Sequence, residues 1–202
     1  MRAGVVNGSA EPLLLGYGLR QTAAPLGSGR LDPNARNGPP YHAPMAERAR
    51  DLMLAVEQRL QELERVTRDT ATAQWAQVCK AEGWPVALVA YHVARGFDRV
   101  ASFIEAAASG EGPHRYNWDE THALNARIAG EHPLPTRDEV LATARESIER
   151  VRSVVSQMSD ADLAEVAFIN GPFQGSFEWL VRTLMPKHAD GHLASIASAL
   201  AN

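Results

Sequence analysis

The chain has a single cysteine, Cys79, among its 202 residues, so no intramolecular disulfide can form. Disulfides belong to oxidising compartments, and their exclusion favours a reducing one. Long apolar runs are also missing, since none approaches the roughly 20 residues that a membrane-spanning helix requires. The opening residues 1–18 make a poor signal peptide because polar residues interrupt their apolar stretch. We therefore expect a cytoplasmic protein, in which Cys79 is an inert, buried thiol.

The charge is small and dispersed. The formal net charge is −4 and the sequence pI is about 6.0. No run of Lys and Arg suggests a basic patch, so neither nucleic acid nor an acidic membrane would be attracted to this surface. We expect no nucleic-acid partner and no membrane partner.

Composition divides the chain into two parts. Residues 1–44 hold 7 of the 15 glycines and 6 of the 12 prolines, without sustained periodicity. Such a segment buries little apolar area and is costly to order. We interpret 1–44 as a flexible leader, or as the product of a mis-assigned start that precedes Met45. The folded domain is expected to span 45–202.

Apolar residues at three- and four-residue intervals predict four long helices. They cover about 46–67, 85–108, 136–158 and 176–200, and the third opens with a capping box at Thr136. Pro186 should kink the fourth helix by removing a hydrogen-bond donor. The stretch 114–135 is long enough to cross the bundle and should contain a short helix over 119–129. No segment is predicted to be a β-strand, and 170–175 is interpreted as a loop. The predicted fold is all-α, a four-helix bundle with one long crossover and antiparallel neighbours where the connections are short.

Two of the seven histidines have a distinctive position. His188 and His192 are four residues apart, which places both rings on one face of the fourth helix, in its apolar stripe. His92 lies on the inward stripe of the second helix. Buried imidazoles need partners, so each is either a core histidine bonded to a carbonyl or carboxylate, or a metal ligand. The pattern does not decide between the two, and spacing alone cannot join His92 to the pair. The other four histidines are expected in loops or on the surface: His42, His114, His122 and His132.

A site built from neutral imidazoles would favour zinc, nickel, iron or copper over magnesium or calcium, with zinc or nickel as the first choices. Three protein ligands leave coordination positions open, as in catalytic rather than structural sites. Arg95 is a candidate for holding an anionic substrate, or an ordinary solvent-facing residue. Asn125 is a candidate for facing the open metal position, or a turn or cap residue.

Three separated stretches resemble the DinB-like (YfiT-like) family of metalloenzymes. In the first, Trp84 is followed eight residues later by His92, near the start of the second helix. The second is the pair His188 and His192 late in the fourth helix. The third is the stretch 124–128 with the capping-box helix after it. The likeness covers about residues 46–200. Two residues depart from the family's pattern, because Pro186 precedes the histidine pair and Gly191 lies within it.

The resemblance implies a four-helix bundle with a divalent metal ion held by His92, His188 and His192. It also implies a homodimer, and an activity that uses a low-molecular-weight thiol such as mycothiol or bacillithiol. Two hypotheses follow. In the first, the protein is a metal-dependent thiol S-transferase or hydrolase that acts on an electrophilic small molecule. In the second, it is a stress-protection protein that binds a small molecule or metal without turnover.

Overall fold

The computed structural model describes residues 47–201, and four long helices dominate this part of the chain. They are α1 (Glu47–Asp69), α2 (Val86–Ala108), α4 (Arg137–Val155) and α7 (Met185–Leu200), the last preceded by α6 (Phe177–Trp179) and a π-helical turn, Leu180–Leu184. Helix α4 packs on α2 and α1, and α7 packs on the same two helices from the other side. The predicted four-helix bundle is confirmed. The expected leader and its His42 lie outside the described residues.

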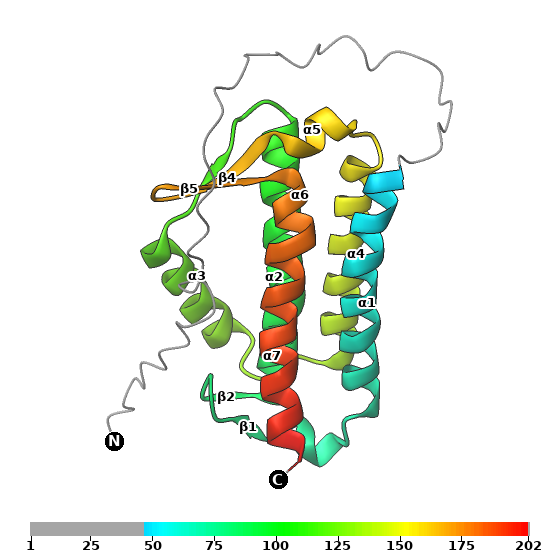
Figure 1. Cartoon of the computed structure of the whole chain (residues 1–202). Helices are drawn as coiled ribbons and strands as arrows, with labels where there is room; N and C mark the ends of the chain where they lie inside the picture. Colours follow the sequence, from blue (N-terminus) through cyan, green and yellow to red (C-terminus); the bar gives the residue numbers. More distant parts are fainter. Residues whose placement is uncertain (1–46, 202) are drawn as a thin grey trace.

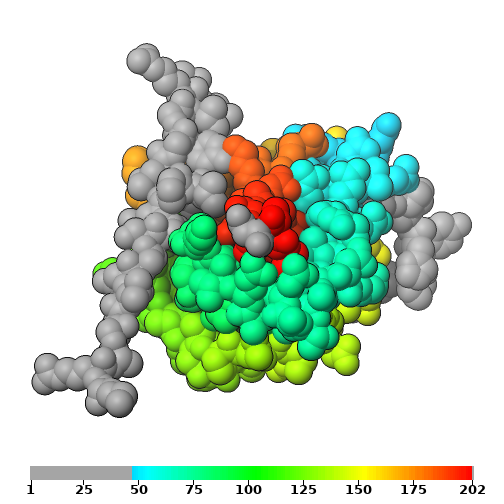
Figure 2. Space-filling view, turned by 90° about the horizontal axis from the view of Figure 1, so that it is seen from below, coloured from blue at the N-terminus to red at the C-terminus, as the bar shows by residue number. Residues whose placement is uncertain are grey.

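The first two helices of the bundle, α1 and α2, are consecutive in the sequence but do not lie side by side. Helix α1 descends in Figure 1, α2 and α4 both ascend, and α7 descends. Because α1 and α2 lie across the bundle from each other, the prediction that short connections join antiparallel neighbours is wrong for this pair. Their connection crosses the end of the bundle through a 3-10 helix, Thr72–Ala76, and the hairpin β1 (Val78–Cys79) and β2 (Trp84–Pro85). Figure 2, which views that end, shows the last turn of α7 beside this segment.

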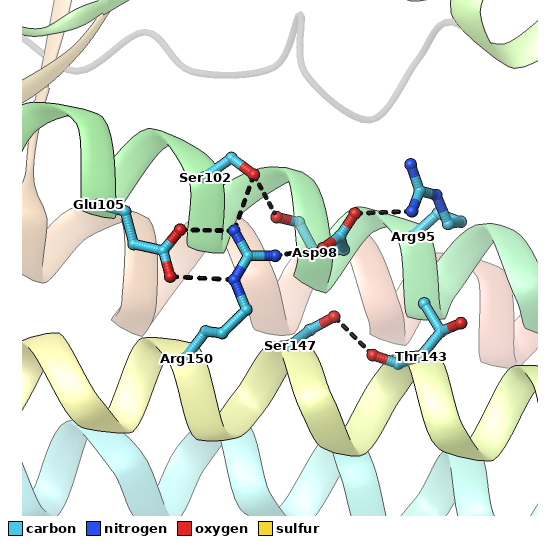
Figure 3. A network of polar contacts seen from close by, with 7 residues as sticks. All are labelled: Arg95, Asp98, Ser102, Glu105, Thr143, Ser147 and Arg150. Carbon is cyan, nitrogen blue, oxygen red and sulfur yellow. Dashed lines mark hydrogen bonds and ion pairs between the residues drawn. The ribbon is translucent and has the colours of Figure 1, made fainter.

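A polar cluster fastens α2 to α4 (Figure 3). The Arg150 guanidinium on α4 bonds both carboxylate oxygens of Glu105, the Ser102 hydroxyl and Asp98, all on α2. Arg95 joins the same cluster through Asp98, at 2.7 Å. One guanidinium thus bridges two turns of the neighbouring helix on the outer side of the bundle. Beneath it the two helices bury large apolar residues, including Phe97, Ile104 and Ile148.

The crossover contains more order than the sequence indicated. Helix α3 (Trp118–Glu131) matches the predicted short helix, and the side chain of Asn117 caps it by accepting from the backbone N–H groups of Asp119 and Glu120. Strand β3 (His114–Arg115) pairs in parallel with β4 (Val166–Asn170), which forms a hairpin with β5 (Phe173–Ser176). A short helix, α5 (Asp160–Ala164), leads into it.

The strands correct two predictions, that the chain lacks β-structure and that 170–175 is a loop. The run 166–169 is a short apolar strand, and the two-residue turn Gly171-Pro172 has glycine at its first central position, as type II′ hairpin turns do. Gly171 has φ of +55°, a backbone conformation that residues with a side chain rarely adopt. This small sheet lies beside α2, and its aromatic side chains pack against that helix.

The fourth helix passes through Pro186 without a break. Ser176 caps α6 by accepting from the backbone N–H of Trp179 at 3.1 Å. The Met185 N–H then bonds the Leu180 carbonyl five residues back, which closes a π-turn, and Pro186 follows in the first turn of α7. The predicted kink is replaced by this wider turn, and α6 and α7 form one continuous rod in Figure 1. No helix within residues 47–201 is long and apolar enough to cross a membrane.

Candidate metal centre

The bundle core contains three histidine rings arranged as a nearly equilateral triangle. His92 comes from α2, and His188 and His192 come from successive turns of α7. The ring centroids are 4.9 Å apart for His92 and His188, 4.7 Å for His92 and His192, and 4.8 Å for the α7 pair. One ligand nitrogen from each ring lies within 4.8 Å of the other two. The structure therefore brings together the three histidines that the sequence could not join by spacing.

Two of these nitrogens are already separated like ligands of one ion. The Nε2 atoms of His92 and His188 are 3.2 Å apart. Two bonds of about 2.0–2.1 Å meeting at a tetrahedral angle would place zinc-bound nitrogens roughly 3.3 Å apart. The donor set therefore fits a borderline divalent metal, and the three histidines can hold one.

The close approach of α7 to α2 depends on a glycine. The ring of His188 occupies the space beside Gly96, one turn after His92 on α2. A Cβ atom at position 96 would lie 2.3 Å from Cε1 of His188 and 2.5 Å from its Nδ1. Real Cβ atoms essentially never make contacts this short, so any larger residue would force the ring to move. Gly96 thus provides the room in which His188 reaches the triangle.

Burial keeps the imidazoles in the form that binds metal. Burial, followed by the nearby His192, lowers the pKa of His92 to about 3. Burial, together with His92 and His192, lowers the pKa of His188 well below its ordinary value. Both rings are therefore neutral near pH 7, and each has a lone pair to offer. The indole of Trp84 packs edge-on against His92, with ring centroids 5.4 Å apart, and limits how that ring can turn.

Glu82, which the sequence analysis did not identify, holds the third ring. Its Oε1 accepts a hydrogen bond from Nδ1 of His192 at 2.9 Å, and its Oε2 accepts from the Ser195 hydroxyl at 2.6 Å. Burial opposes ionisation of this carboxyl group, but the bonds from His192 and Ser195 outweigh it, and the pKa of Glu82 is lowered. Glu82 therefore carries a negative charge although it is only 8% exposed.

This carboxylate determines the tautomer of His192. With Nδ1–H donated to Glu82, the lone pair of His192 is on Nε2, as in the carboxylate–histidine–metal arrangements of known sites. Glu82 lies in the turn between β1 and β2, where Gly83 has φ of +70°. The available sequence signals were its place before Gly83 and the position of Ser195 three residues after His192. Neither signal identifies an acceptor without the fold.

The other candidate residues lie elsewhere. Arg95 forms an ion pair with Asp98, and Asn125 lies in the middle of α3, whose capping residue is Asn117. Asp190, between the paired histidines in the sequence, forms an ion pair with Arg59 at 3.0 Å. Cys79 is fully buried, and burial raises the pKa of its thiol to about 11, in agreement with an inert role.

The remaining described histidines divide into two groups. His122 is on the exposed side of α3, and His132 ends that helix, where it lies near the ring of Tyr91. His114 departs from the prediction of a surface or loop residue. It belongs to β3 and stacks on Phe103, with centroids 3.7 Å apart, because the sheet lays this strand against α2.

Comparison with known proteins places the chain in a family. The structure of YfiT from Bacillus subtilis, described as a probable metal-dependent hydrolase with an unusual four-helix bundle topology, superposes with a TM-score of 0.61. The alignment has 17% sequence identity and covers 80% of this chain and 91% of YfiT, a likeness that establishes the fold. No curated protein sequence matches the chain. The sequence does match the DinB superfamily over residues 23–196, and the chain belongs to that family.

Proposed function

We propose that the protein is an enzyme that binds zinc or nickel through His92, His188 and His192 and acts on an electrophilic small molecule. The observation that carries this proposal is the triangle of three histidine rings, oriented at one corner by the buried Glu82. An ion held by three protein ligands keeps open positions, where it lowers the pKa of a bound water or thiol and supplies a nucleophile near pH 7.

The chain's own residues prepare the site for that chemistry. His92 and His188 are neutral before any metal arrives, so binding need not displace their protons. Glu82 orients His192 and adds one negative charge beside the ion. Because both of its oxygens are engaged by His192 and Ser195, Glu82 acts as a positioning residue rather than as a general base.

The single thiol of the chain is not the nucleophile of the proposed reaction. Cys79 is buried and its thiol has a raised pKa, so it provides no reactive thiolate. Two nucleophiles remain for this proposal, a water molecule and a low-molecular-weight thiol. The description of YfiT as a probable hydrolase supports the first, and the resemblance to thiol-using family members supports the second. We propose the thiol as the co-substrate of a transferase and test it against hydrolysis.

The test begins with elemental analysis of untagged wild-type protein. We expect about one zinc or nickel ion per chain, and loss of that metal in His188→Ala. The matched control is His122→Ala, which removes an exposed histidine from α3 and should leave the metal content unchanged. Stoichiometric metal that persists in His188→Ala would contradict the ligand assignment.

Activity is then measured on the metal-loaded and chelator-treated full chain. One assay follows conjugation of mycothiol or bacillithiol to monobromobimane, and the other follows hydrolysis of 4-nitrophenyl acetate without thiol. Metal-dependent conjugation supports the transferase, and metal-dependent hydrolysis alone supports a hydrolase. Tight metal binding with neither reaction would favour the non-catalytic protective role.

Homodimer formation and a cytoplasmic location stay predictions. Light scattering of the purified protein tests the first, since a dimer would have twice the 21.9 kDa mass of the chain.

A further inference from the structure

The face of α2 that carries His92 continues to an arginine. Arg99 and Phe103 follow His92 by seven and eleven residues, which returns each to within about 20° of the same helix face. Seven residues correspond to roughly 10 Å of helix, so His92 and Arg99 start about that far apart along one face of α2. A molecule that lies along this face could therefore reach both Arg99 and the metal centre.

Within residues 47–201, Arg99 lacks the carboxylate partner that Arg95 and Arg150 have. Its Nη2 donates to the Thr121 hydroxyl at 3.2 Å, and its guanidinium lies 5.5 Å from the centre of the Phe103 ring. Its Nε is buried without a hydrogen-bond partner, and no ion pair joins Arg99 to a carboxylate among residues 47–201. Arg95 and Arg150, which lie on the outer side of the same region, both have carboxylate partners. Leaving a buried guanidinium N–H unpaired is costly, and a planar carboxylate is the group that its geometry fits best.

Arg99 adjoins an aromatic cluster, defined here as Phe103, His114, Phe168 and Trp179. His114 stacks on Phe103. The ring centroids of Phe168 and His114 are 6.2 Å apart, and those of Trp179 and Phe168 are 5.6 Å apart. Two further nitrogens in this cluster, Nε2 of His114 and Nε1 of Trp179, are also buried without partners. Burial and the charge of Arg99 lower the pKa of His114, so the cluster adds no competing charge.

We propose that Arg99 binds the carboxylate of an organic substrate whose apolar body packs against the aromatic cluster and whose electrophilic group reaches the metal centre. The inference rests on the proposed function, because it names the substrate class of that site as an aryl or alkyl carboxylate. Charge-assisted, two-pronged bonding by arginine gives both orientation and affinity. The aromatic rings contribute apolar contact area.

The test is a calorimetric titration of the full chain with 4-phenylbutyrate, compared with the uncharged 4-phenylbutanol. Both metal-loaded and chelator-treated protein are used, since a carboxylate could also bind a metal ion directly. The variant is Arg99→Gln, and the matched control is Arg95→Gln, one turn earlier on the same helix and paired with Asp98. Circular dichroism checks that each variant is folded. The ¹⁵N–¹H resonance of the Arg99 Nε, assigned by its absence in Arg99→Gln, reports binding at the residue itself.

We expect 4-phenylbutyrate to bind metal-free wild-type protein and to shift the Arg99 Nε resonance. Arg99→Gln should weaken this binding about 10- to 100-fold, whereas Arg95→Gln should leave it within about twofold. The alcohol should bind more weakly and without dependence on Arg99. Equal affinity of wild type and Arg99→Gln, or no binding of 4-phenylbutyrate by wild type, would overturn the proposal.

The two proposals fail in different ways. If 4-phenylbutyrate binds only the metal-loaded protein, and equally well in Arg99→Gln, the carboxylate binds the metal ion. This result would refute the Arg99 site and would be consistent with the proposed metal enzyme. If binding depends on Arg99 but the protein takes up no zinc or nickel, the result supports the carboxylate site and refutes the proposed function.

Discussion

Replacing Gly96 by alanine adds one methyl group at the point where α2 and the His188 ring are in closest contact. The new Cβ would lie 2.3 Å from Cε1 of His188, 2.5 Å from its Nδ1 and 3.2 Å from its Nε2. The ring cannot remain where it is at these distances. Because its Nε2 is the atom that lies 3.2 Å from Nε2 of His92, moving the ring separates two ligands of the proposed metal ion.

The substitution has opposing effects on the stability of the metal-free protein. Overpacking a filled core costs about 1–3 kcal/mol. Alanine is the better helix former by about 1 kcal/mol, so the free energy of unfolding should fall by no more than about 2 kcal/mol. Metal affinity has no such compensation. Disturbing a group that merely supports a ligand typically costs 10- to 100-fold in affinity, so displacing the ligand should cost at least about 100-fold, near 2.7 kcal/mol.

The assay is a competition titration of zinc against a chromophoric chelator, paired with urea unfolding of the metal-free protein. Gly130→Ala is the matched control, because Gly130 is also helical and a Cβ there meets nothing within 4 Å. It should bind zinc like wild type and unfold at equal or higher urea concentration. Wild-type zinc affinity in Gly96→Ala would refute the reasoning, because it would show that His188 either moves freely or is not a ligand.

Removing the carboxylate by Glu82→Ala leaves Nδ1 of His192 without its acceptor, and should lower zinc affinity about 10- to 100-fold in the same titration; an unchanged affinity would show that the bond does not orient the ring. Stability should also depend on pH, because the folded pKa of His92 is about 3 against an ordinary value of 6.5. Below about pH 6.5, His92 is protonated in the unfolded chain but stays neutral in the folded protein. The free energy of unfolding of the metal-free protein should therefore fall as the pH drops toward 3. This residue contributes about 1.4 kcal/mol per pH unit. His92→Leu should flatten that slope in urea unfolding, and an equal slope in both proteins would contradict the burial argument.

The helices were predictable from sequence because their signals are local. Apolar spacing and the capping box at Thr136 act within a few residues, and the observed capping box is the predicted one. The pairing of His188 with His192 is equally local, since one helical turn separates them. His92 could be assigned to the same metal site only by resemblance to a family, because the residues near it in the sequence do not determine which helix it will face.

The parts that the sequence did not reveal depend on contacts between distant segments. Glu82 meets His192 across 110 residues, and its role exists only once the β1–β2 hairpin lies against α7. His114 looked like a loop residue because β3 has two residues and is defined by its pairing with β4, more than 50 residues away. The turn at Gly171-Pro172 did carry a local hairpin signal, but 170–175 was interpreted as a loop because glycine and proline are common in loops.

The π-turn at 180–184 determines which way the two halves of the last helix face. It accommodates one residue more than a regular helical path would, and each residue of an α-helix turns the chain by about 100°. A variant lacking one residue of this turn would regain ordinary helical geometry. Trp179 and His188 would keep nearly the same relative direction, because the deleted residue is the extra one that the wide turn accommodates. Deleting a residue from the regular helix just before His188 would instead rotate Trp179 by about 100° relative to His188. Such a deletion should be tolerated far less than one in the β4–β5 turn, because it would displace the aromatic cluster relative to the histidines.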